Sequence, residues 1–410
     1  MRSLSILVVA MLVYTTAFAQ QALWGGQNII SPEVHDDNTV TFRFQAPKAI
    51  TVQLTGDFLP PQKMETPYGT FDMPGVTDLK EGKDGLWEYT TPAPLKSDLF
   101  GYSFIVDGLR VTDPNNVYLI RDVASVTNVF LIGGGLGDYY SVKDVSHGSV
   151  TRCWYNSPGL KTERRITIYT PPGYETSKES YPVFYLLHGA GGDEEAWINL
   201  GRSSQILDNL IAQGKAKPMI VVMSNGHTAN PAAPGESSRG FYKPSMSAGS
   251  ITAGDMESSF IDIIKFVESN YRVKKDKANR AIAGLSMGGF HSQYISAFYP
   301  NTFDYIGLFS GAGLFASASA SQNETPEVYR DFDKKLEAQK KNGYKLYWIA
   351  CGNTDFVLQG VTDFRKKMDD LGLKYIYRES EGGIRGATGE CISRSLYQCY
   401  SGNRVSHQNK

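Results

Sequence analysis

The chain has 410 residues, of which 41% are hydrophobic and 20% are charged, and its formal net charge is −1. This composition is that of a globular protein, and the length favours two domains of ordinary size. A near-neutral charge without a basic arm gives no general attraction to phosphate backbones, so we expect no nucleic-acid partner.

The N-terminal segment is typical of a secretory signal peptide. One arginine precedes an apolar run, and the small-residue site Ala17-Phe18-Ala19 follows it, which predicts cleavage before Gln20. The run is too short for an anchor, and no later stretch is long enough to span a bilayer. We therefore expect residues 1–19 to be removed and the mature chain to be secreted or periplasmic, without membrane insertion.

Residues 20–136 show short alternating runs between turn residues, among them TVTFRFQAP, AITVQLTGDF, GLWEYTTPAP, LFGYSFIVDG and LRVTDPNN. Strands at this spacing predict a small all-β sandwich. We place its aromatic side chains in the sandwich core, with a sugar-stacking platform as the alternative; they are Trp24, Trp87, Tyr89 and Tyr102. The glycine-rich stretch that follows predicts a linker over residues 137–148, without strand or helix.

Residues 149–383 change to a different pattern. Short apolar runs such as YPVFYLLHG, PMIVVMSNG and KLYWIACG alternate with helix-length segments such as DMESSFIDIIKFVESNY. Strands that alternate with helices predict a mostly parallel sheet covered on both faces. In such sheets the chemistry lies at the carboxyl ends of the strands.

The segment AIAGLSMGGF places Gly284, Ser286 and Gly288 in a G-x-S-x-G motif between a strand-like and a helix-like run. In this context the glycines permit a tight turn that lifts the serine hydroxyl above the sheet. We therefore predict that Ser286 is a nucleophile. The N–H of Met287, directly after it, is expected to be one oxyanion donor.

The segment YLLHGAGGDEEAW ends a predicted strand with a glycine-rich loop. Such a loop can turn backbone N–H groups toward a carbonyl oxygen. His188 precedes the serine by nearly a hundred residues, and we interpret it as structural or substrate-facing, not as the base. The four cysteines show no C-x-x-C spacing, so we expect neither a metal site nor a cofactor.

The segment LYWIACGNTDF supplies the acid, because Asp355 follows a strand end in the order serine, then acid, then histidine. Asp363 is the alternative, but it falls within the helical pattern VTDFRKKMDDLG.

These motifs, with RITIYTPPGYE before them, resemble the esterase family of carbohydrate esterases, which includes feruloyl and acetylxylan esterases. The part with SPEVHDDNTVTFRFQAP, LTGDF and GLWEYT resembles an immunoglobulin-like module related to glycogen-binding modules. The resemblance implies an α/β-hydrolase with a doubly wound, mostly parallel sheet, preceded by a small all-β immunoglobulin-like sandwich. It also implies that Ser286 is the nucleophile, that Asp355 orients the base, and that Ala190 and Met287 form the oxyanion hole.

The same resemblance implies His-x-Trp after the strand LKYIYRESEGG, yet the sequence continues with Ile384 and a glycine-rich tail. If Gly383 to Gly386 are encoded GGC ATA CGT GGC, reading one base earlier gives His, Thr and Trp, and the tail can decode as HTWRNWRVYLSEFVPMLF. We interpret residues 384–410 as an aberrant, disordered tail produced by a frameshift; a diverged tail is the alternative. Without an imidazole, Ser286 is a poor nucleophile.

The other histidines are weaker candidates for the base. We assign His35 and His147 to the module and linker, and His227 and His291 to structural or substrate-facing positions; His407 lies in the tail. The loop over residues 227–245 contains Phe241 and Tyr242 and is expected to bind substrate.

The sequence therefore predicts a secreted serine carboxylic-ester hydrolase that acts on feruloylated or acetylated plant polysaccharides or oligosaccharides and is impaired by the missing base. A catalytically dead carbohydrate-binding homologue is the second hypothesis. An acyltransferase that uses the same serine is the third.

Overall fold

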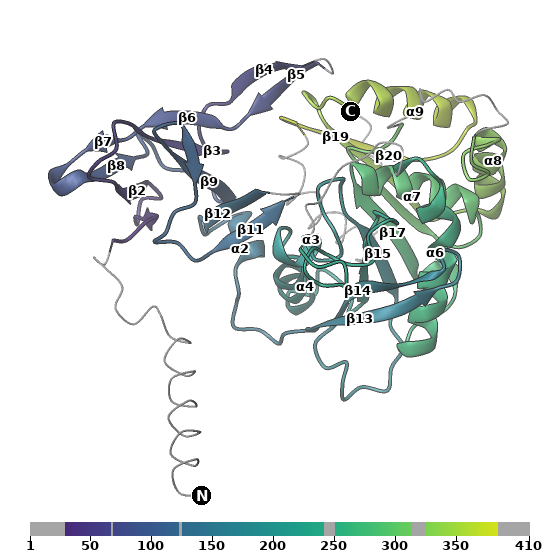
Figure 1. Cartoon of the computed structure of the whole chain (residues 1–410). Coiled ribbons are helices and arrows are strands. Elements are labelled where there is room, and N and C mark those ends of the chain that lie inside the picture. Colours follow the sequence, from purple (N-terminus) through teal and green to yellow (C-terminus); the bar gives the residue numbers. More distant parts are fainter. Residues whose placement is uncertain (1–28, 67–68, 123–124, 242–250, 314–324, 384–410) are drawn as a thin grey trace, which may run out of the picture.

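The computed structural model describes residues 29–66, 69–122, 125–241, 251–313 and 325–383. Figure 1 shows an N-terminal part built from strands and a C-terminal part in which helices flank one large sheet. The predicted signal peptide over residues 1–19 and the tail after Gly383 lie outside the described residues.

The N-terminal part packs two antiparallel sheets against each other, with a short hairpin beside them. The first sheet has the order β1-β2-β8-β7, and the second has the order β11-β12-β9-β3-β6, with β10 paired to β9. The hairpin pairs β4 with β5. The strands are β1 Glu33–Val34, β2 Val40–Gln45, β3 Val52–Gly56, β4 Gln62–Thr66, β5 Gly69–Met73, β6 Gly75–Asp78, β7 Lys80–Glu81, β8 Leu86–Thr90, β9 Leu99–Val106, β10 Leu109–Val111, β11 Leu119–Asp122 and β12 Ser125–Leu131.

Aromatic side chains fill the space between these two sheets. Trp87 and Tyr102 are 7% and 1% exposed, and both belong to one core cluster with Phe42 and Phe104. The Trp87 indole donates a hydrogen bond to the Ala46 carbonyl, so even its polar atom is satisfied internally. These rings are therefore core residues and not an exposed sugar platform. Trp24, also considered for that platform, lies outside the described residues.

The predicted linker contains a helical turn, α2 Gly137–Tyr140, that the sequence pattern did not indicate. Tertiary contacts hold it, because the Tyr140 side chain is buried in a core cluster of the C-terminal part. The Asn209 side-chain amide also donates hydrogen bonds to the carbonyls of Asp138, Tyr139 and Ser141. The expectation of a segment without helix was wrong, since packing overrides the low helix propensity of glycine.

The C-terminal part contains an eight-stranded sheet with the order β13-β14-β16-β15-β17-β18-β19-β20. The pairs β13–β14 and β14–β16 are antiparallel, and every later pair is parallel, as the alternating pattern predicts. The strands are β13 Ser149–Ser157, β14 Thr162–Thr170, β15 Val183–Leu187, β16 Ile220–Ser224, β17 Arg280–Leu285, β18 Tyr305–Phe309, β19 Leu346–Gly352 and β20 Ile376–Ser380.

Helices cover both faces of this sheet (Figure 1), and each face has its own buried apolar cluster. Besides α2, they are α3 Ala196–Asn199, α4 Ser203–Ala212, α6 Asp255–Asn270, α7 Met287–Phe298, α8 Phe332–Asn342 and α9 Leu358–Asp370. No helix among the described residues is long and apolar enough to cross a membrane.

The strand register brings the predicted site segments to one edge of the sheet. Leu187 at the end of β15 pairs with Gly284, and Leu285 at the end of β17 pairs with Phe309 at the end of β18. Gly352 at the end of β19 pairs with Ser380 at the end of β20. The loops that follow these strands therefore begin side by side.

The two parts of the molecule touch next to one of these loops. Strand β11 contacts α3, and the Arg121 guanidinium forms an ion pair with the Asp193 carboxylate. Leu99 and Leu131 of the sandwich pack against an apolar cluster of the C-terminal part. The sandwich is thus attached directly to the loop that follows β15.

Candidate active site

Ser286 lies in a strained turn between β17 and α7. Its backbone has φ 52° and ψ −117°, a region that side-chain-bearing residues rarely adopt, and its N–H donates to the Phe309 carbonyl at 2.8 Å. The turn holds the side chain at the amino end of α7 and at the carboxyl edge of the sheet. This is the geometry that a G-x-S-x-G nucleophile elbow requires.

The glycines around Ser286 are required by close backbone contacts. A Cβ at Gly284 would lie 2.3 Å from the Gly288 carbonyl carbon, and a Cβ at Gly288 would lie 2.3 Å from the Leu187 carbonyl oxygen. A Cβ at Gly311 would lie 2.2 Å from the Ser286 carbonyl oxygen. Only glycine fits at these three positions, so the motif is needed for the turn itself.

Two backbone N–H groups beside Ser286 are available to an oxyanion. Met287 is the first residue of α7, so its N–H has no acceptor within the helix and points along the positive end of the helix dipole. Gly189 lies against the serine, since a Cβ built on it would be 3.6 Å from the Ser286 Cβ. The next N–H, that of Ala190, donates no hydrogen bond within the part of the chain that the structure describes.

His188 is fixed by two backbone groups and is 2% exposed. Its Nε2 accepts a hydrogen bond from the Gly226 N–H at 2.8 Å, so its Nδ1 carries the proton and donates to the Gly189 carbonyl at 2.7 Å. Burial lowers the pKa of His188 to about 3. The ring is therefore neutral with no free nitrogen, which excludes it as the base and as a substrate contact and fits a structural role.

The loop after β16 supplies the other predicted substrate-binding residues. Phe241 is 96% exposed. Tyr242, proposed with it, lies outside the described residues. His227 of the same loop is 8% exposed, and its Nε2–H donates to the Ala190 carbonyl at 2.7 Å. Burial lowers the pKa of His227 as well.

Asp355 is a buried carboxylate with one unused oxygen. It is 6% exposed, and its Oδ1 accepts a hydrogen bond from the Val357 N–H at 3.1 Å. Its Oδ2 has no partner of good geometry among the described residues. Burial raises the pKa of Asp355, and the nearby Ser310 hydroxyl and the Val357 N–H moderate this rise.

Asp355 and Ser286 lie on opposite sides of the end of β18. Ser286 donates its N–H to Phe309, the last residue of that strand, while Ser310 donates its N–H to Ala350 of β19 and lies beside Asp355. Both groups therefore lie at the carboxyl edge of the sheet, next to the end of β18. Asp363 has no such position, because it is exposed on α9 and accepts a hydrogen bond from Gln359.

The turn after β20 lies against the acid loop. The Thr354 N–H donates to the Gly382 carbonyl at 3.2 Å, and the Gly382 N–H donates to the Asn353 side chain at 3.0 Å. Gly382 is therefore held against the loop that carries Asp355. Ile384, where we expected the base, lies outside the described residues, as do the tail and His407.

The remaining described histidines each contact another polar side chain. The Nδ1 atom of His291 lies 2.7 Å from the Glu257 carboxylate, and both side chains are buried, while His291 Nε2 has no partner of good geometry among the described residues. His147 pairs with Asp208, and His35 with the Thr41 hydroxyl. The described residues contain no group of three or more His, Cys, Asp or Glu side chains that could hold a metal ion.

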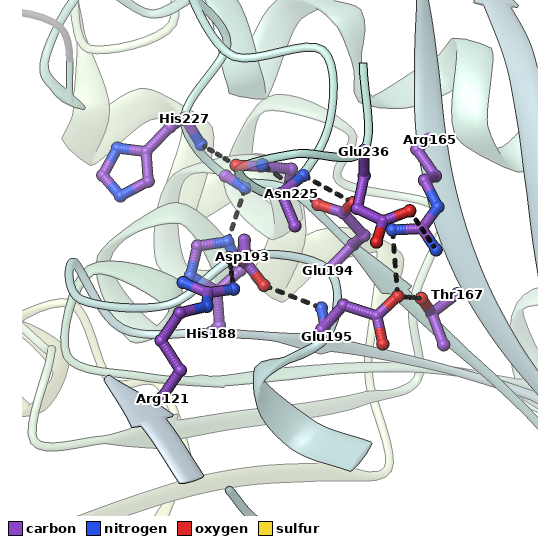
Figure 2. A network of polar contacts seen from close by, with 12 residues as sticks. Arg121, Arg165, Thr167, His188, Asp193, Glu194, Glu195, Asn225, His227 and Glu236 are labelled. Atoms are coloured by element: carbon purple, nitrogen blue, oxygen red, sulfur yellow. Dashed lines mark hydrogen bonds and ion pairs between the residues drawn. The ribbon is translucent and has the colours of Figure 1, made fainter. Parts of the chain in front are cut away.

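The sequence reasoning missed a buried polar network that supports the loop after β15 (Figure 2). Glu194 accepts hydrogen bonds from the Ala233 N–H and the Asn225 amide, at 2.7 and 3.1 Å, and Glu195 binds the Arg152 guanidinium through two nitrogens. Arg165 bridges the two carboxylates at 3.3 and 3.1 Å. The available signal was a run of three acidic residues in a loop next to a buried strand, a place where charges need partners.

The family model described as "Putative esterase" matches residues 157–366, just over half of the chain, and the chain belongs to this family. The matched region contains the elbow, the loop after β15 and Asp355. An endo-1,4-beta-xylanase/feruloyl esterase of Xylanibacter ruminicola is 32% identical over 297 residues, which are 68% of this chain and 39% of that protein. An esterase of Mycobacterium tuberculosis is 28% identical over 269 residues, 64% of this chain and 48% of that protein. The chain thus spans less than half the length of these curated relatives.

Two solved structures show the same fold. A CE1 ferulic acid esterase of Anaeromyces mucronatus superposes with a TM-score of 0.52 at 22% identity and covers 65% of this chain and 94% of its own. The enterobactin esterase FES of Shigella flexneri superposes with a TM-score of 0.59 at 14% identity and covers 92% of this chain and 98% of its own. Its wider coverage extends to the N-terminal sandwich, so the α/β-hydrolase fold behind an all-β part is shared.

Proposed function

We propose that this protein is a secreted or periplasmic serine carboxylic-ester hydrolase that removes feruloyl or acetyl groups from plant polysaccharides or oligosaccharides. The observation that carries the proposal is the elbow at Ser286, beside which the N–H groups of Ala190 and Met287 donate no hydrogen bond given for the described residues. The named activities of the xylanase/feruloyl esterase relative and of an acetyl esterase relative support the choice of acyl group and glycan.

In the proposed reaction the Ser286 hydroxyl attacks the ester carbonyl carbon and loses its proton to an imidazole. The carbonyl electrons move onto the oxygen, which the N–H groups of Ala190 and Met287 receive. The intermediate then collapses, the sugar hydroxyl leaves with the proton, and the acyl group stays on the serine. Water attacks this acyl-enzyme in the same way and releases the acid.

Asp355 has the proposed task of orienting that imidazole. Its buried Oδ2 has no partner of good geometry among the described residues, and a ring N–H placed after Gly383 would supply one. The sequence has Ile384 at this point. We therefore include in the proposal that ester hydrolysis by the chain as written is impaired. A glycan-binding homologue without turnover is the second candidate, which the isoleucine at position 384 favours.

The test is hydrolysis of p-nitrophenyl acetate and methyl ferulate by the full chain, with and without free imidazole as a substitute base. We expect imidazole to accelerate turnover by the chain well beyond its effect on Ser286→Ala, because free imidazole itself cleaves aryl esters. Equal rates for the two proteins, with and without imidazole, would favour the glycan-binding homologue. Product analysis with an added sugar acceptor separates hydrolysis from acyl transfer.

A further inference from the structure

Two successive carbonyl groups of the loop after β15 are held by histidine side chains. The His188 Nδ1–H donates to the Gly189 carbonyl, and the His227 Nε2–H donates to the Ala190 carbonyl, each at 2.7 Å. A carbonyl oxygen only accepts hydrogen bonds, so each of these ring nitrogens carries a hydrogen. The two histidines come from different loops but act on neighbouring peptide groups.

These contacts fix the direction of the Ala190 N–H. In a trans peptide the C=O of one residue and the N–H of the next point in opposite directions. The Gly189 carbonyl is held by His188 and by the Gly192 N–H at 2.9 Å, so the Ala190 N–H points the other way. The hydrogen bond from His227 holds the following peptide plane. Both planes that flank the Ala190 Cα are therefore fixed, next to Ser286.

The loop that carries His227 is itself held by a buried side chain of β14. One nitrogen of the fully buried Arg164 guanidinium donates to the carbonyls of Asn225 and His227, at 2.8 and 3.1 Å. The Asn225 side chain accepts from the His227 N–H at 2.9 Å and donates to Glu194 (Figure 2). His227 is thus presented to the Ala190 carbonyl by a frame of buried polar groups.

Buried charges of this kind are weak contributors to net stability, because their desolvation offsets the attraction between them. A frame of this composition instead fixes a loop geometry in advance, which is what stabilisation of an oxyanion requires.

We propose that His227 is a positioning residue of the ester-hydrolysing site, whose Nε2–H holds the Ala190 carbonyl so that the oxyanion loop keeps its N–H groups aimed in front of Ser286. The inference rests on the proposed function, since it assigns a role within that reaction. It predicts that the N–H of the side chain at position 227 is needed, and not its bulk.

The test compares three substitutions at one position. His227→Gln keeps an N–H donor close to the place of Nε2, His227→Met has similar length without a donor, and His227→Asn places its N–H near the place of Nδ1. We expect His227→Met and His227→Asn to lower kcat for p-nitrophenyl acetate about 100-fold with little change in KM, because misaimed donors act mainly on the transition state. His227→Gln should keep kcat within about threefold, on the same reasoning.

The assay uses the full chain with free imidazole and, in parallel, the full chain carrying HTWRNWRVYLSEFVPMLF from position 384. The rate of Ser286→Ala is subtracted in each case. His147→Gln and His147→Met serve as matched controls, because His147 pairs with Asp208 and contacts neither loop. Thermal unfolding of every variant shows whether the comparison is between folded proteins.

The outcomes separate the two proposals. If kcat is equal in His227→Gln and His227→Met, or if only KM changes, the positioning role is refuted while the ester hydrolase stands. If Ser286→Ala hydrolyses the ester as fast as its parent, both with free imidazole and with the replaced tail, the proposed function is refuted. The role of His227 is then refuted as well. If His227→Met does not fold, the kcat of His227→Asn is compared with that of His227→Gln instead. Equal values refute the positioning role, and a much lower value for His227→Asn supports it.

Discussion

The candidate site has two sides, which differ in the hydrogen bonding of their polar groups. The oxyanion side consists of the loops after β15 and β16, which carry His188 and His227. The acid side consists of the loop after β19, which carries Asp355, and the turn after β20. On the oxyanion side both ring nitrogens of His188 are hydrogen-bonded, and three buried acidic side chains each have partners. On the acid side Asp355 uses one oxygen, and its buried Oδ2 has no partner of good geometry among the described residues.

This difference shows which half of the machinery is complete in the described residues. Buried polar atoms are almost always paired in folded proteins, so we expect Asp355 Oδ2 to receive a donor that the described residues do not supply. On the oxyanion side the hydrogen bonds of His188 and Glu194 hold the loop before any substrate arrives. In the proposed mechanism this donor is an imidazole N–H carried by the segment after Gly383.

The largest expected effect comes from supplying that group. We predict that replacing the segment from Ile384 onward by HTWRNWRVYLSEFVPMLF raises kcat for p-nitrophenyl acetate by about 10⁴- to 10⁶-fold, the usual cost of losing a triad residue. The new imidazole would receive the Ser286 proton and donate to Asp355. Steady-state kinetics of the two full-length proteins measure the difference.

A control carries the same replacement with alanine in place of its single histidine, and it should be as slow as the original chain. The frameshift behind this prediction is contradicted if the codons of Gly382 to Arg385 cannot read CAY one base early. It is equally contradicted if the chain as written turns over aryl esters at ordinary enzyme rates.

The second prediction uses Asp355 to test the same hypothesis, that the chain as written lacks the catalytic imidazole. Asp355→Asn should lower kcat by up to about 10⁴-fold in the chain with the replaced tail, because the amide favours the wrong imidazole tautomer. In the chain as written the same substitution should change the rate little, since the proposal assigns no imidazole to its tail. Asp363→Asn, on the exposed face of α9, is the matched control. Equal losses in both chains would mean that Asp355 acts by another route.

From the sequence we could predict that Ser286 and Asp355 lie at the same edge of the sheet. We could not predict the buried polar network that holds the neighbouring loops. The motifs around Ser286 and Asp355 are local, since each residue follows its own strand end, and the strand register then brings them together. The contacts of Arg164 and Glu194 join β14, the loop after β15 and the loop after β16, and spacing along the chain does not encode them. The helical turn at Gly137–Tyr140 was missed for the same reason, because packing on α4 forms it.

The third prediction concerns the stability of the paired side. Glu194→Leu removes the acceptor of the Ala233 N–H and the Asn225 amide and leaves Arg165 with one carboxylate fewer. We expect the free energy of unfolding to fall by about 2–5 kcal/mol, because two buried donors lose their acceptor at about 1–3 kcal/mol each, whereas Arg165 keeps Glu195 and Glu236. Glu194→Gln keeps an acceptor oxygen, so it should lose less. Urea unfolding of both variants tests this, and equal losses would show that shape alone matters here.

The smallest expected effect is a pH dependence that belongs to the oxyanion side. Burial lowers the pKa of His188 to about 3, whereas an unfolded histidine titrates near 6.5. Between these values the unfolded chain binds a proton at His188 that the folded chain does not, so stability rises with pH by up to about 1.4 kcal/mol per pH unit. Buried carboxylates such as Asp355 and Glu194, whose pKa values burial raises, act in the opposite direction.

The contribution of His188 is isolated by comparing the pH dependence of stability in two chains that differ only at this residue. His188→Gln can still donate to the Gly189 carbonyl and accept from the Gly226 N–H, but it does not titrate. We therefore expect the free energy of unfolding of His188→Gln, measured in urea from pH 4 to 6, to rise less steeply with pH than that of the parent chain. The two slopes should differ by about one proton, or about 1.4 kcal/mol per pH unit. Parallel slopes would mean that His188 is protonated in the folded chain, which is incompatible with its Nε2 accepting the Gly226 N–H and would undo the rigid geometry assigned to the oxyanion side.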